Sequence, residues 1–487
     1  MKTIFVFLFV SVWATGLMGQ PSKRVLTFEE AIRIALKNSV QLNQQRNTLA
    51  LNQLQKTAGY AALAPSVSGQ LSASQFNGNS FNQNAGVVVN GVRDNISGNL
   101  NATLNLFNGF NSINSLRQAS AQLEAQTEFV KRTTQDVINT VSTQYLQVML
   151  DQELLRIAKQ NYEALAKQLE QTKEQVAVGA RSPVDEFNQD AQAKGAELRM
   201  VQAEITLQND KAVLSQTLLM DAFEDFDVQT PNWDINSVAA QSLDIEAMAS
   251  QAKEHRGDYQ RAVKSEEAAQ FGMRVFRGAM TPSLVAFFNY GSAYNFQRGE
   301  PDSITFQSSS LSVVVDASQP SGYAVAVNRF NVTQANPEQR TFGDQFRRDN
   351  VYKQYGVQLS IPLFNGFQNR TNYVRQRVQY ENARLDRQNA ENQIKTDVLR
   401  AARNYEGARK AYTVTVDQLT AAQKAFELET ERFNLGVTNF VDYINANRVF
   451  VQAQTDKAQA EYRLLFQKIV VDYAVGTLKI DDIPQGQ

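Results

Sequence analysis

The sequence predicts an α+β membrane protein made of duplicated units, each joining a β-hairpin to a hairpin of long helices. Three observations carry this prediction: motifs that recur at a constant offset, two proline-free segments of 69 residues, and segments in which apolar and polar residues alternate. The first indicates a duplication. The second indicates helices far longer than those of globular domains, and the third indicates strands with one apolar face.

The composition of the 487 residues excludes several classes of function. A net charge of −1 gives no sign of a nucleic-acid partner. The chain has no cysteine, which excludes disulfides, thiolate chemistry and cysteine-based metal sites. With His255 as the one histidine, a multi-histidine metal site is impossible within one chain, and we expect His255 at a solvated helix end. We therefore expect no metal and no cofactor.

The first 19 residues have the pattern of a secretory signal peptide. Lys2 supplies the positive charge, an apolar core runs over 4–13, and small residues follow at Gly16 and Gly19. The alternative is a short membrane anchor, but the apolar run is too short to cross a bilayer. We expect the mature chain to leave the cytoplasm.

Two sequence motifs in the first half of the chain recur in the second half at the same offset. The motif Leu-Phe-Asn-Gly-Phe occupies 106–110 and again 363–367, and Gly179 in a short turn recurs as Gly436, both at an offset of 257 (363 − 106). Before these motifs the offset is 217, because Pro65 recurs as Pro282, so the second half contains 40 extra residues (257 − 217). The predicted organisation is a signal peptide over 1–19, a first repeat over 20–220, a linker over 221–242, a second repeat over 243–476 and a tail over 477–487.

Each repeat is expected to contain a very long helix, a turn and a return helix. The long helices are predicted over 110–178 and 367–435, and each would be about 100 Å long at ~1.5 Å per residue. The return helices are predicted over 184–220 and 440–476. Apolar residues recur at alternating steps of three and four, the spacing of packed coiled coils. On the helices alone, a structural coiled coil is an equally good interpretation.

The strands are expected in one hairpin per repeat, over about 65–106 and about 282–363. The clearest alternation runs from Ile96 to Leu106, and we expect strands of about ten residues between polar loops over 77–93 and 295–350. Such strands fit an outer-membrane barrel, with Tyr290, Tyr294 and Phe296 in an aromatic girdle. The alternative is a soluble sandwich, for which additional strands would have to come from 311–315 and 323–327. Four strands cannot close a barrel, so the chain must oligomerise, in a number that spacing leaves open.

At this point the sequence resembles the TolC family of outer-membrane efflux proteins. The resemblance rests on the opening at 26–31, the duplicated units, Pro362 before Leu363-Phe364-Asn365-Gly366, the two helical turns and the Gly476-Thr477-Leu478 ending. It implies a homotrimer in the outer membrane, with a 12-stranded β-barrel continued into the periplasm by an α-helical barrel. It further implies a passive channel that works with a periplasmic adaptor and an inner-membrane pump.

The resemblance also suggests where the channel closes and where the adaptor binds. The family has two aspartates, three residues apart, after the second turn; here Asp442 matches the first and Asn445 stands at the second, with Asp185 and Asn188 as first-half counterparts. These four residues form the predicted periplasmic gate. Aspartate just inside a helix start is also favoured by the helix dipole, so the alternative is a capping role. The predicted adaptor contacts are the turns Gly179-Ala180-Arg181-Ser182-Pro183 and Gly436-Val437-Thr438-Asn439.

Two other functions compete with a passive channel. A periplasmic coiled-coil adaptor or scaffold would keep the long helices but would have no use for the alternating strands. An enzyme, such as a carboxylate-based hydrolase, requires a concave site that long rods do not provide. The sequence also has no glycine-rich phosphate loop. We therefore expect no enzyme activity, and the energy for transport must come from a partner.

Overall fold

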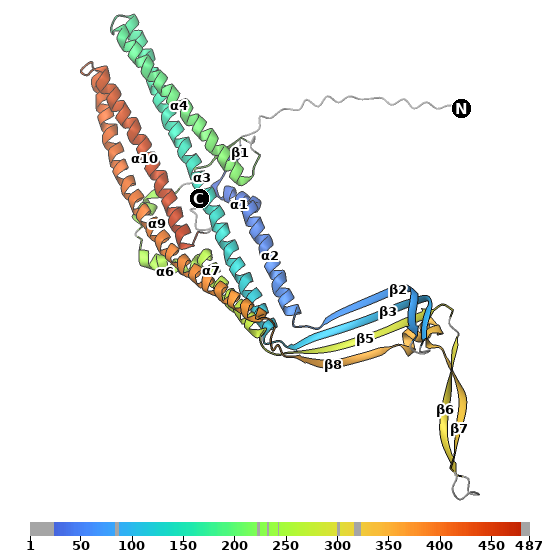
Figure 1. The fold of residues 1–487 in the computed structure, drawn as a ribbon. Coiled ribbons are helices and arrows are strands. Elements are labelled where there is room, and N and C mark those ends of the chain that lie inside the picture. The colour runs from blue at the N-terminus through green and yellow to red at the C-terminus, as the bar shows by residue number, and fades with distance from the viewer. Residues whose placement is uncertain are drawn as a thin grey trace, which may run out of the picture. The chain divides into compact units, whose positions relative to one another are not determined.

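The computed structural model describes residues 24–82, 87–221, 225–230, 233–241, 243–299, 302–315 and 323–478 (Figure 1). The predicted signal peptide and residues 479–487 of the predicted tail lie outside these ranges. The chain divides into two compact units. Unit 1 comprises 1–52, 123–265 and 383–487, and unit 2 comprises 53–122 and 266–382.

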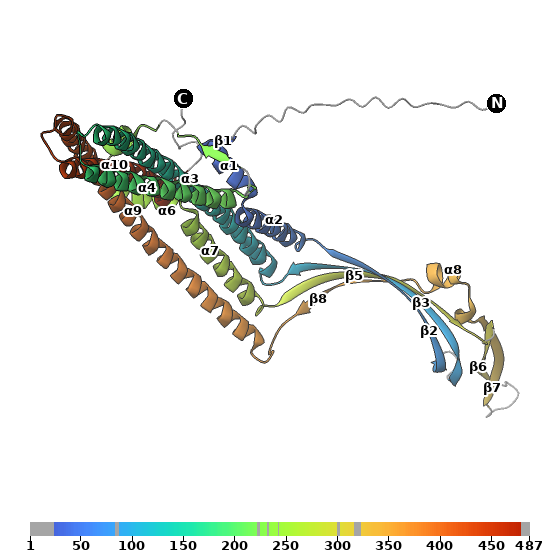
Figure 2. The ribbon, with the colours of Figure 1, turned by 90° about the horizontal axis from the view of Figure 1, so that it is seen from above.

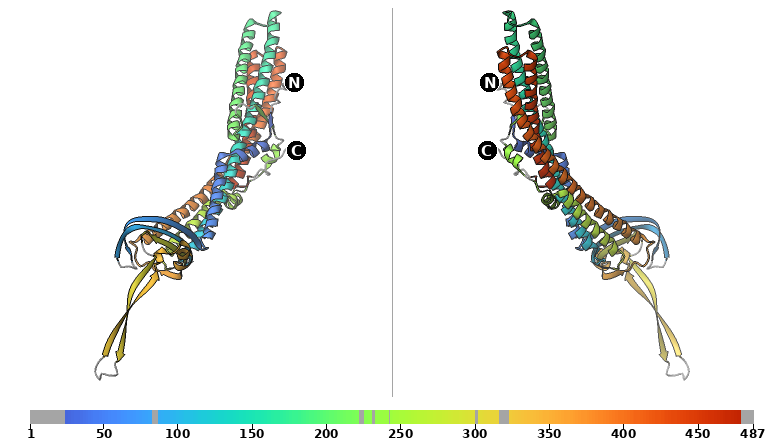
Figure 3. Two further views of the ribbon diagram at one scale, coloured as in Figure 1. Left: turned by 90° about the vertical axis from the view of Figure 1, so that its right-hand side faces the viewer. Right: turned by 90° about the vertical axis from the view of Figure 1, so that its left-hand side faces the viewer.

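The helices of the two halves match each other in length. The pairs are α1 (Phe28–Asn38) with α6 (Ile245–His255), α2 (Val40–Ala61) with α7 (Gly257–Gly278), α3 (Asn111–Ala177) with α9 (Gln368–Asn434), and α4 (Pro183–Leu218) with α10 (Phe440–Val475). The two members of each pair contain 11, 22, 67 and 36 residues, respectively. Within unit 1, α3 lies beside α4 and α9 beside α10 (Figure 3). His255 is the last residue of α6 and is exposed, as expected.

In unit 1, the first described residues pack against the segment that connects the two repeats. Strand β1 (Arg24–Leu26) pairs in parallel with β4 (Phe226–Val228). The Tyr145 hydroxyl, fully buried, bonds to the carbonyls of Leu26 at 2.8 Å and Gln229 at 2.7 Å. The segment 221–242, expected to be only a linker, therefore supplies β4 and also α5 (Ile235–Ala240). Three-residue strands were missed because they are too short to show a periodicity.

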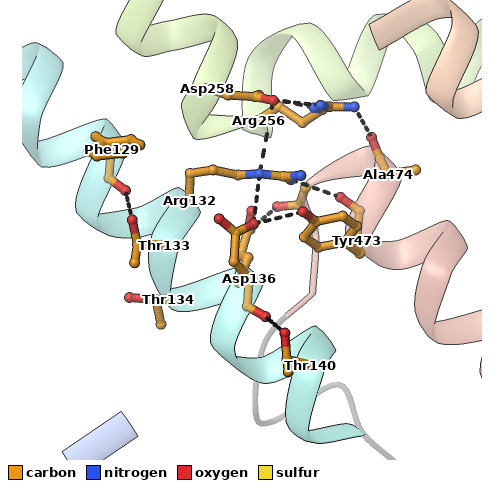
Figure 4. A network of polar contacts seen from close by, with 12 residues as sticks. Phe129, Arg132, Thr133, Thr134, Asp136, Thr140, Arg256, Asp258, Tyr473 and Ala474 are labelled. Atoms are coloured by element: carbon orange, nitrogen blue, oxygen red, sulfur yellow. Dashed lines mark hydrogen bonds and ion pairs between the residues drawn. The ribbon is translucent and has the colours of Figure 1, made fainter. Parts of the chain in front are cut away.

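Unit 1 also contains an ionic network among α3, α7 and α10 (Figure 4), which Asp397 extends to α9. The buried Arg256 guanidinium contacts both carboxylate oxygens of Asp258, at 2.5 and 3.0 Å, and an Asp397 oxygen at 3.0 Å. Arg132 stacks on the Tyr473 ring, 3.8 Å from its centroid, and the Tyr473 hydroxyl donates to Asp136 at 2.7 Å. Burial alone would raise the pKa of Asp258, but hydrogen bonds and charge from Arg256, with charge from Arg132, lower that pKa overall.

Unit 2 contains a four-stranded antiparallel sheet in the order β2-β3-β5-β8 (Figure 2). The strands are β2 (Ser66–Asn82), β3 (Val87–Phe107), β5 (Ser283–Gln297) and β8 (Tyr352–Ser360). The expected length of about ten residues is wrong for the first hairpin, whose strands have 17 and 21 residues. The predicted polar loop 77–93 is mostly strand, because backbone hydrogen bonds continue the ladder where the side chains no longer alternate in polarity.

The predicted loop 295–350 is also largely structured. Strands β6 (Ser303–Val315) and β7 (Tyr323–Ala335) pair over 13 residues each, so the short strands considered at 311–315 and 323–327 are only parts of longer ones. The 3₁₀ turn η1 (Pro337–Gln339), helix α8 (Phe342–Asp344) and π turn η2 (Gln345–Asp349) follow. These elements use largely polar sequence that carries no clear period.

Candidate channel surfaces and helical turns

One face of the four-stranded sheet is apolar across all four strands. Residues opposite each other in an antiparallel pair project to the same face. The register therefore puts Leu71, Gly98 and Ser292 in one row, and Ala286 and Val357 in another. The other members of this face are Val67, Gly69, Ala73, Ile96, Leu100, Ala102, Leu104, Leu284, Phe288, Tyr290, Tyr294, Tyr355, Leu359 and one charged residue, Lys353, opposite Tyr290.

These apolar side chains are largely uncovered. Leu71 is 76% exposed, Val357 66% and Tyr355 81%. A continuous exposed apolar surface of this extent marks contact with a membrane or another protein. From Leu284 to Tyr294 the strand rises about 34 Å, or roughly 26 Å along the membrane normal at a tilt of ~40°, the height of the apolar band of an outer-membrane barrel.

The opposite face of the same sheet is polar and forms ladders of side-chain contacts. The hydroxyls of Ser66 and Thr103 lie 2.6 Å apart, and those of Ser72 and Ser97 lie 2.7 Å apart. The Tyr352 hydroxyl donates to the Asn99 side-chain oxygen at 3.0 Å. This face suits the water-filled interior of a barrel, because its hydroxyls and amides satisfy one another or meet water.

The repeated Leu-Phe-Asn-Gly-Phe motif builds the same backbone turn twice. Gly109 and Phe110 have φ of +64° and +60°, and Gly366 and Phe367 have +63° and +62°. A bulky residue rarely adopts this left-handed conformation, so its occurrence at both copies indicates a constrained turn. The turn places two aromatic rings edge to face, Phe107 with Phe110 at 5.4 Å and Phe364 with Phe367 at 5.6 Å. These rings lie where the sheet meets the long helices, a position that suits an aromatic girdle.

The predicted adaptor-contacting turns close the two helical hairpins. Gly179 and Gly436 end α3 and α9 with φ of +75° and +73°, the conformation that glycine supplies at a helix end. Ser182 caps α4 by accepting from the Val184 amide at 3.2 Å, and Asn439 caps α10 by accepting from the Asp442 amide at 2.9 Å. Ala180, Pro183 and Val437 are exposed. Thr438 contacts Asp442 through its hydroxyl at 3.4 Å.

The four predicted gate residues lie in the first two turns of α4 and α10. Asp442, Asn445 and Asn188 are exposed, and Asp185 is half-buried. Asn445 accepts from Arg448 at 3.4 Å. Within the described part of the chain, no hydrogen bond or ion pair links the residues of one turn to those of the other. The geometry of a single chain is therefore compatible with both the gate and the capping interpretations.

Beside Arg181, which the sequence interpretation included, the structure adds partner residues that it missed. Arg181, on the first turn, stacks on the Phe433 ring of α9 at 4.3 Å, and Phe433 stacks on Tyr443 at 4.7 Å. The Asn447 amide donates to Asn161 at 3.2 Å, which joins α10 to α3. A heptad spacing of aromatic residues at Phe426, Phe433 and Phe440 was the available sequence signal for this cluster.

Two further findings concern the described residues only. No helix there is both long and apolar enough to cross a membrane. The ranges that the structure describes contain no group of three or more His, Asp or Glu side chains able to hold a metal ion.

A two-faced sheet joined to helical hairpins of this length defines the class of outer-membrane channel proteins that extend into the periplasm. The chain belongs to the outer membrane efflux protein family, which it matches over residues 31–218 and 325–477. It is an efflux channel of the outer membrane.

Named relatives agree with this membership. The chain is 24% identical to outer membrane protein TolC of Vibrio cholerae over 371 residues, which cover 75% of this chain and 72% of that protein. It is 20% identical to outer membrane efflux protein BepC of Brucella suis, over 94% of this chain and 87% of that protein. The solved outer membrane protein VceC of Vibrio cholerae has the same fold, with a TM-score of 0.71 at 14% identity, over 92% of this chain and 96% of that chain.

Proposed function

We propose that three copies of this chain assemble head to tail into a passive channel-tunnel of a tripartite export system. Each copy contributes four strands to a 12-stranded barrel and its helical hairpins to a periplasmic tunnel. A periplasmic adaptor binds at the helical turns, and an inner-membrane pump supplies the energy. The repeats over 20–220 and 243–476 are the two pseudo-equivalent units of each subunit.

The observation that carries this proposal is a difference between two equivalent glycines. A Cβ on Gly109 would lie 2.0 Å from the Thr281 hydroxyl and 2.4 Å from the Gly278 carbonyl oxygen, at the end of α7. A Cβ on Gly366 would meet no described atom within 4 Å. The 217-residue offset makes Ala61 (278 − 217), at the end of α2, the counterpart of Gly278. We infer that α2 of a neighbouring copy fills the empty place beside Gly366.

The open edges of the sheet support the same arrangement. Strands β2 and β8 are the outer strands, and each pairs on one side only within the described chain. Unpaired strand edges are not tolerated in lipid. By the repeat offsets, β8 is the counterpart of β3 and β2 is the counterpart of β5. Ala102 pairs with Phe288 inside the chain, so Leu359 (102 + 257) should pair with Leu71 (288 − 217) of a neighbouring copy. The contact is heterologous, and such contacts form a ring when the rotation between copies closes.

Disulfide trapping tests this register, and the chain offers a background free of cysteine. The double variant Leu71→Cys/Leu359→Cys should form disulfide-linked dimers and trimers under mild oxidation, because paired residues have Cα atoms within about 5.5 Å of each other. The control Leu71→Cys/Tyr355→Cys lies on the same face, about 14 Å out of register. Monomers only, or equal cross-linking of both variants, would contradict the arrangement.

Substitution of the equivalent glycines gives a second test. Gly366→Ala should prevent trimer formation, as measured by size in detergent, although the isolated chain has room for the methyl group. The matched control is Gly436→Ala, which has the same left-handed backbone conformation, with φ of +73° against +63°, and also meets no described atom within 4 Å. Trimers of Gly366→Ala in wild-type yield would refute the proposed contact with α2 of the neighbour.

The gate is proposed for Asp442, Asn445, Asp185 and Asn188, three copies of each around one aperture. Crowded carboxylates in a narrow opening would concentrate cations, so divalent ions should block the channel. In planar bilayers, Asp442→Ala should raise single-channel conductance and weaken block by Mg²⁺. Asp417→Ala, an exposed aspartate on α9, is the control. Unchanged conductance and block in Asp442→Ala would leave Asp442 with the capping role.

A further inference from the structure

One segment of the 40-residue insertion folds over the sheet near the strand ends that lie away from the long helices. This interfacial segment, residues 336–350, contains η1, α8 and η2 and lies beside the end of β5 (Figure 2). Strand β8 reaches only as far as Gly291 on its neighbour, so β5 has an open edge beyond that residue. The segment covers this edge.

Side chains of the segment take the place of the missing strand. The Gln345 amide, 1% exposed, accepts from the Asn295 backbone N–H at 3.0 Å and donates to the Asn295 carbonyl at 2.8 Å. Asn350 donates to the Ala293 carbonyl at 2.7 Å. These contacts satisfy backbone groups that would otherwise face the bilayer unpaired, and they fix the segment on the sheet.

The segment lies on the apolar face of the sheet. The Phe346 ring is the nearest neighbour of a Cβ built on Gly98, at 3.0 Å, and Leu71 is the next residue at 3.6 Å. The Ser292 hydroxyl, on the same face, donates to the Phe346 carbonyl at 2.6 Å. Phe346 therefore lies over the central strand β3, on the face assigned to lipid, whereas Gln345 and Asn350 cap β5 on the side of β8, where a neighbouring copy pairs. If the sheet forms part of the proposed barrel, the surface of the segment around Phe346 faces lipid.

Aromatic and cationic groups meet on this segment. Phe342 stacks on Phe346 at 5.0 Å and packs edge to face on Tyr294 at 5.3 Å, yet it remains 46% exposed. Arg348 pairs with Asp344 and Asp349 in the segment itself. Arg347 is exposed and has no ion-pair partner among the described residues. An exposed aromatic ring and an exposed guanidinium on one short segment are the pattern of a membrane-interface element.

We propose that the interfacial segment is a binding site for a phosphate-bearing anionic lipid of the outer leaflet. The rings of Phe342 and Phe346 contact acyl chains, and the Arg347 guanidinium binds a headgroup phosphate. Guanidinium matches phosphate oxygens through two parallel N–H donors, and the apolar face beneath supplies the contact for the chains. The site lies at the end of the apolar band away from the long helices, about 26 Å along the membrane normal from the other end. This places it at the interface of the outer leaflet.

Lipid-dependent stabilisation tests the headgroup contact. Purified protein in maltoside micelles is titrated with lipid A, with phosphatidylcholine or with inorganic phosphate, and the melting temperature is measured. Lipid A alone should raise the melting temperature. Arg347→Gln should raise the half-maximal lipid A concentration about fivefold, which corresponds to about 1 kcal/mol, while Arg347→Lys retains part of the effect. The control is Arg33→Gln on α1, outside the sheet.

Equal half-maximal concentrations in wild type and Arg347→Gln would overturn the headgroup contact, as would stabilisation by inorganic phosphate alone. Acyl-chain contact is tested separately by Phe342→Trp in vesicles of brominated phosphatidylcholine and lipid A. The fluorescence of this variant should be quenched more strongly than that of wild type, whose described tryptophan is Trp233 in unit 1. Equal quenching would show that the ring does not reach the acyl chains.

Discussion

Asp151 is a buried carboxyl group that should make the folded protein less stable as pH rises. It lies on α3, is 3% exposed, and accepts a hydrogen bond from Gln147 at 3.1 Å. Burial raises the pKa of Asp151 most, and a hydrogen bond and charge from Asp210 on α4 raise it further, from 3.8 to about 7 in total. Lys211, next to Asp210 in sequence, does not neutralise the pair because it bonds to Asp227 at 2.5 Å.

The sign of the effect follows from proton linkage. Between about pH 4 and pH 7 the folded chain binds more protons at this pair than the unfolded chain, so stability falls as pH rises through that range. A shift of about three pKa units sets an upper limit of about 4 kcal/mol for the loss. The realised loss should be nearer 2 kcal/mol, because water and local relaxation lessen the cost of a buried charge.

Asp151→Asn removes the titration and keeps the shape of the side chain. The amide nitrogen can donate to the Asp210 carboxylate, while the amide oxygen still accepts from Gln147. We expect the variant and wild type to melt together at pH 5, and the variant to melt a few degrees higher at pH 8. The assay is thermal unfolding in detergent, followed by circular dichroism from pH 5 to pH 8.5, with Asp417→Asn as the exposed control. If the melting temperatures of wild type and Asp151→Asn depend on pH in the same way, ionisation of the Asp151–Asp210 pair does not destabilise the fold.

Four further substitutions test the turns and the cores. Gly436→Ala should lower the free energy of unfolding by about 1 kcal/mol, because φ is +73° there and alanine is strained in that conformation. Gly407→Ala, in the middle of α9, should raise the free energy of unfolding by up to ~1 kcal/mol, because alanine is the better helix former. Denaturant titration measures both changes. Asp258→Asn should destabilise by about 2 kcal/mol at pH 7, and this difference from wild type should shrink as pH falls through the lowered pKa of Asp258, since the stability it contributes is lost there. Tyr145→Phe should cost about 1–3 kcal/mol, measured by urea unfolding, because it removes the single buried hydroxyl proton that lies between the Leu26 and Gln229 carbonyl oxygens. No loss would show that water replaces the hydroxyl.

The sequence alone determined the features that depend on local periodicity. The long helices were predicted over 110–178 and 367–435 and run over Asn111–Ala177 and Gln368–Asn434. Their ends were visible because glycine follows each one and proline stays out of both. The alternation from Ile96 to Leu106 likewise marked β3, because a strand exposes its period of two wherever one face is apolar.

Tertiary structure alone decided the contacts between segments that are distant in the chain. Arg181 meets Phe433, Asp151 meets Asp210, and Gln345 caps the edge of β5 only after the helices and strands have docked. No short-range pattern encodes these pairs, since each partner looks like an ordinary polar or aromatic residue in its own segment. The physical reason is that periodicity reports which face of an element is apolar, whereas register and docking determine what that face meets.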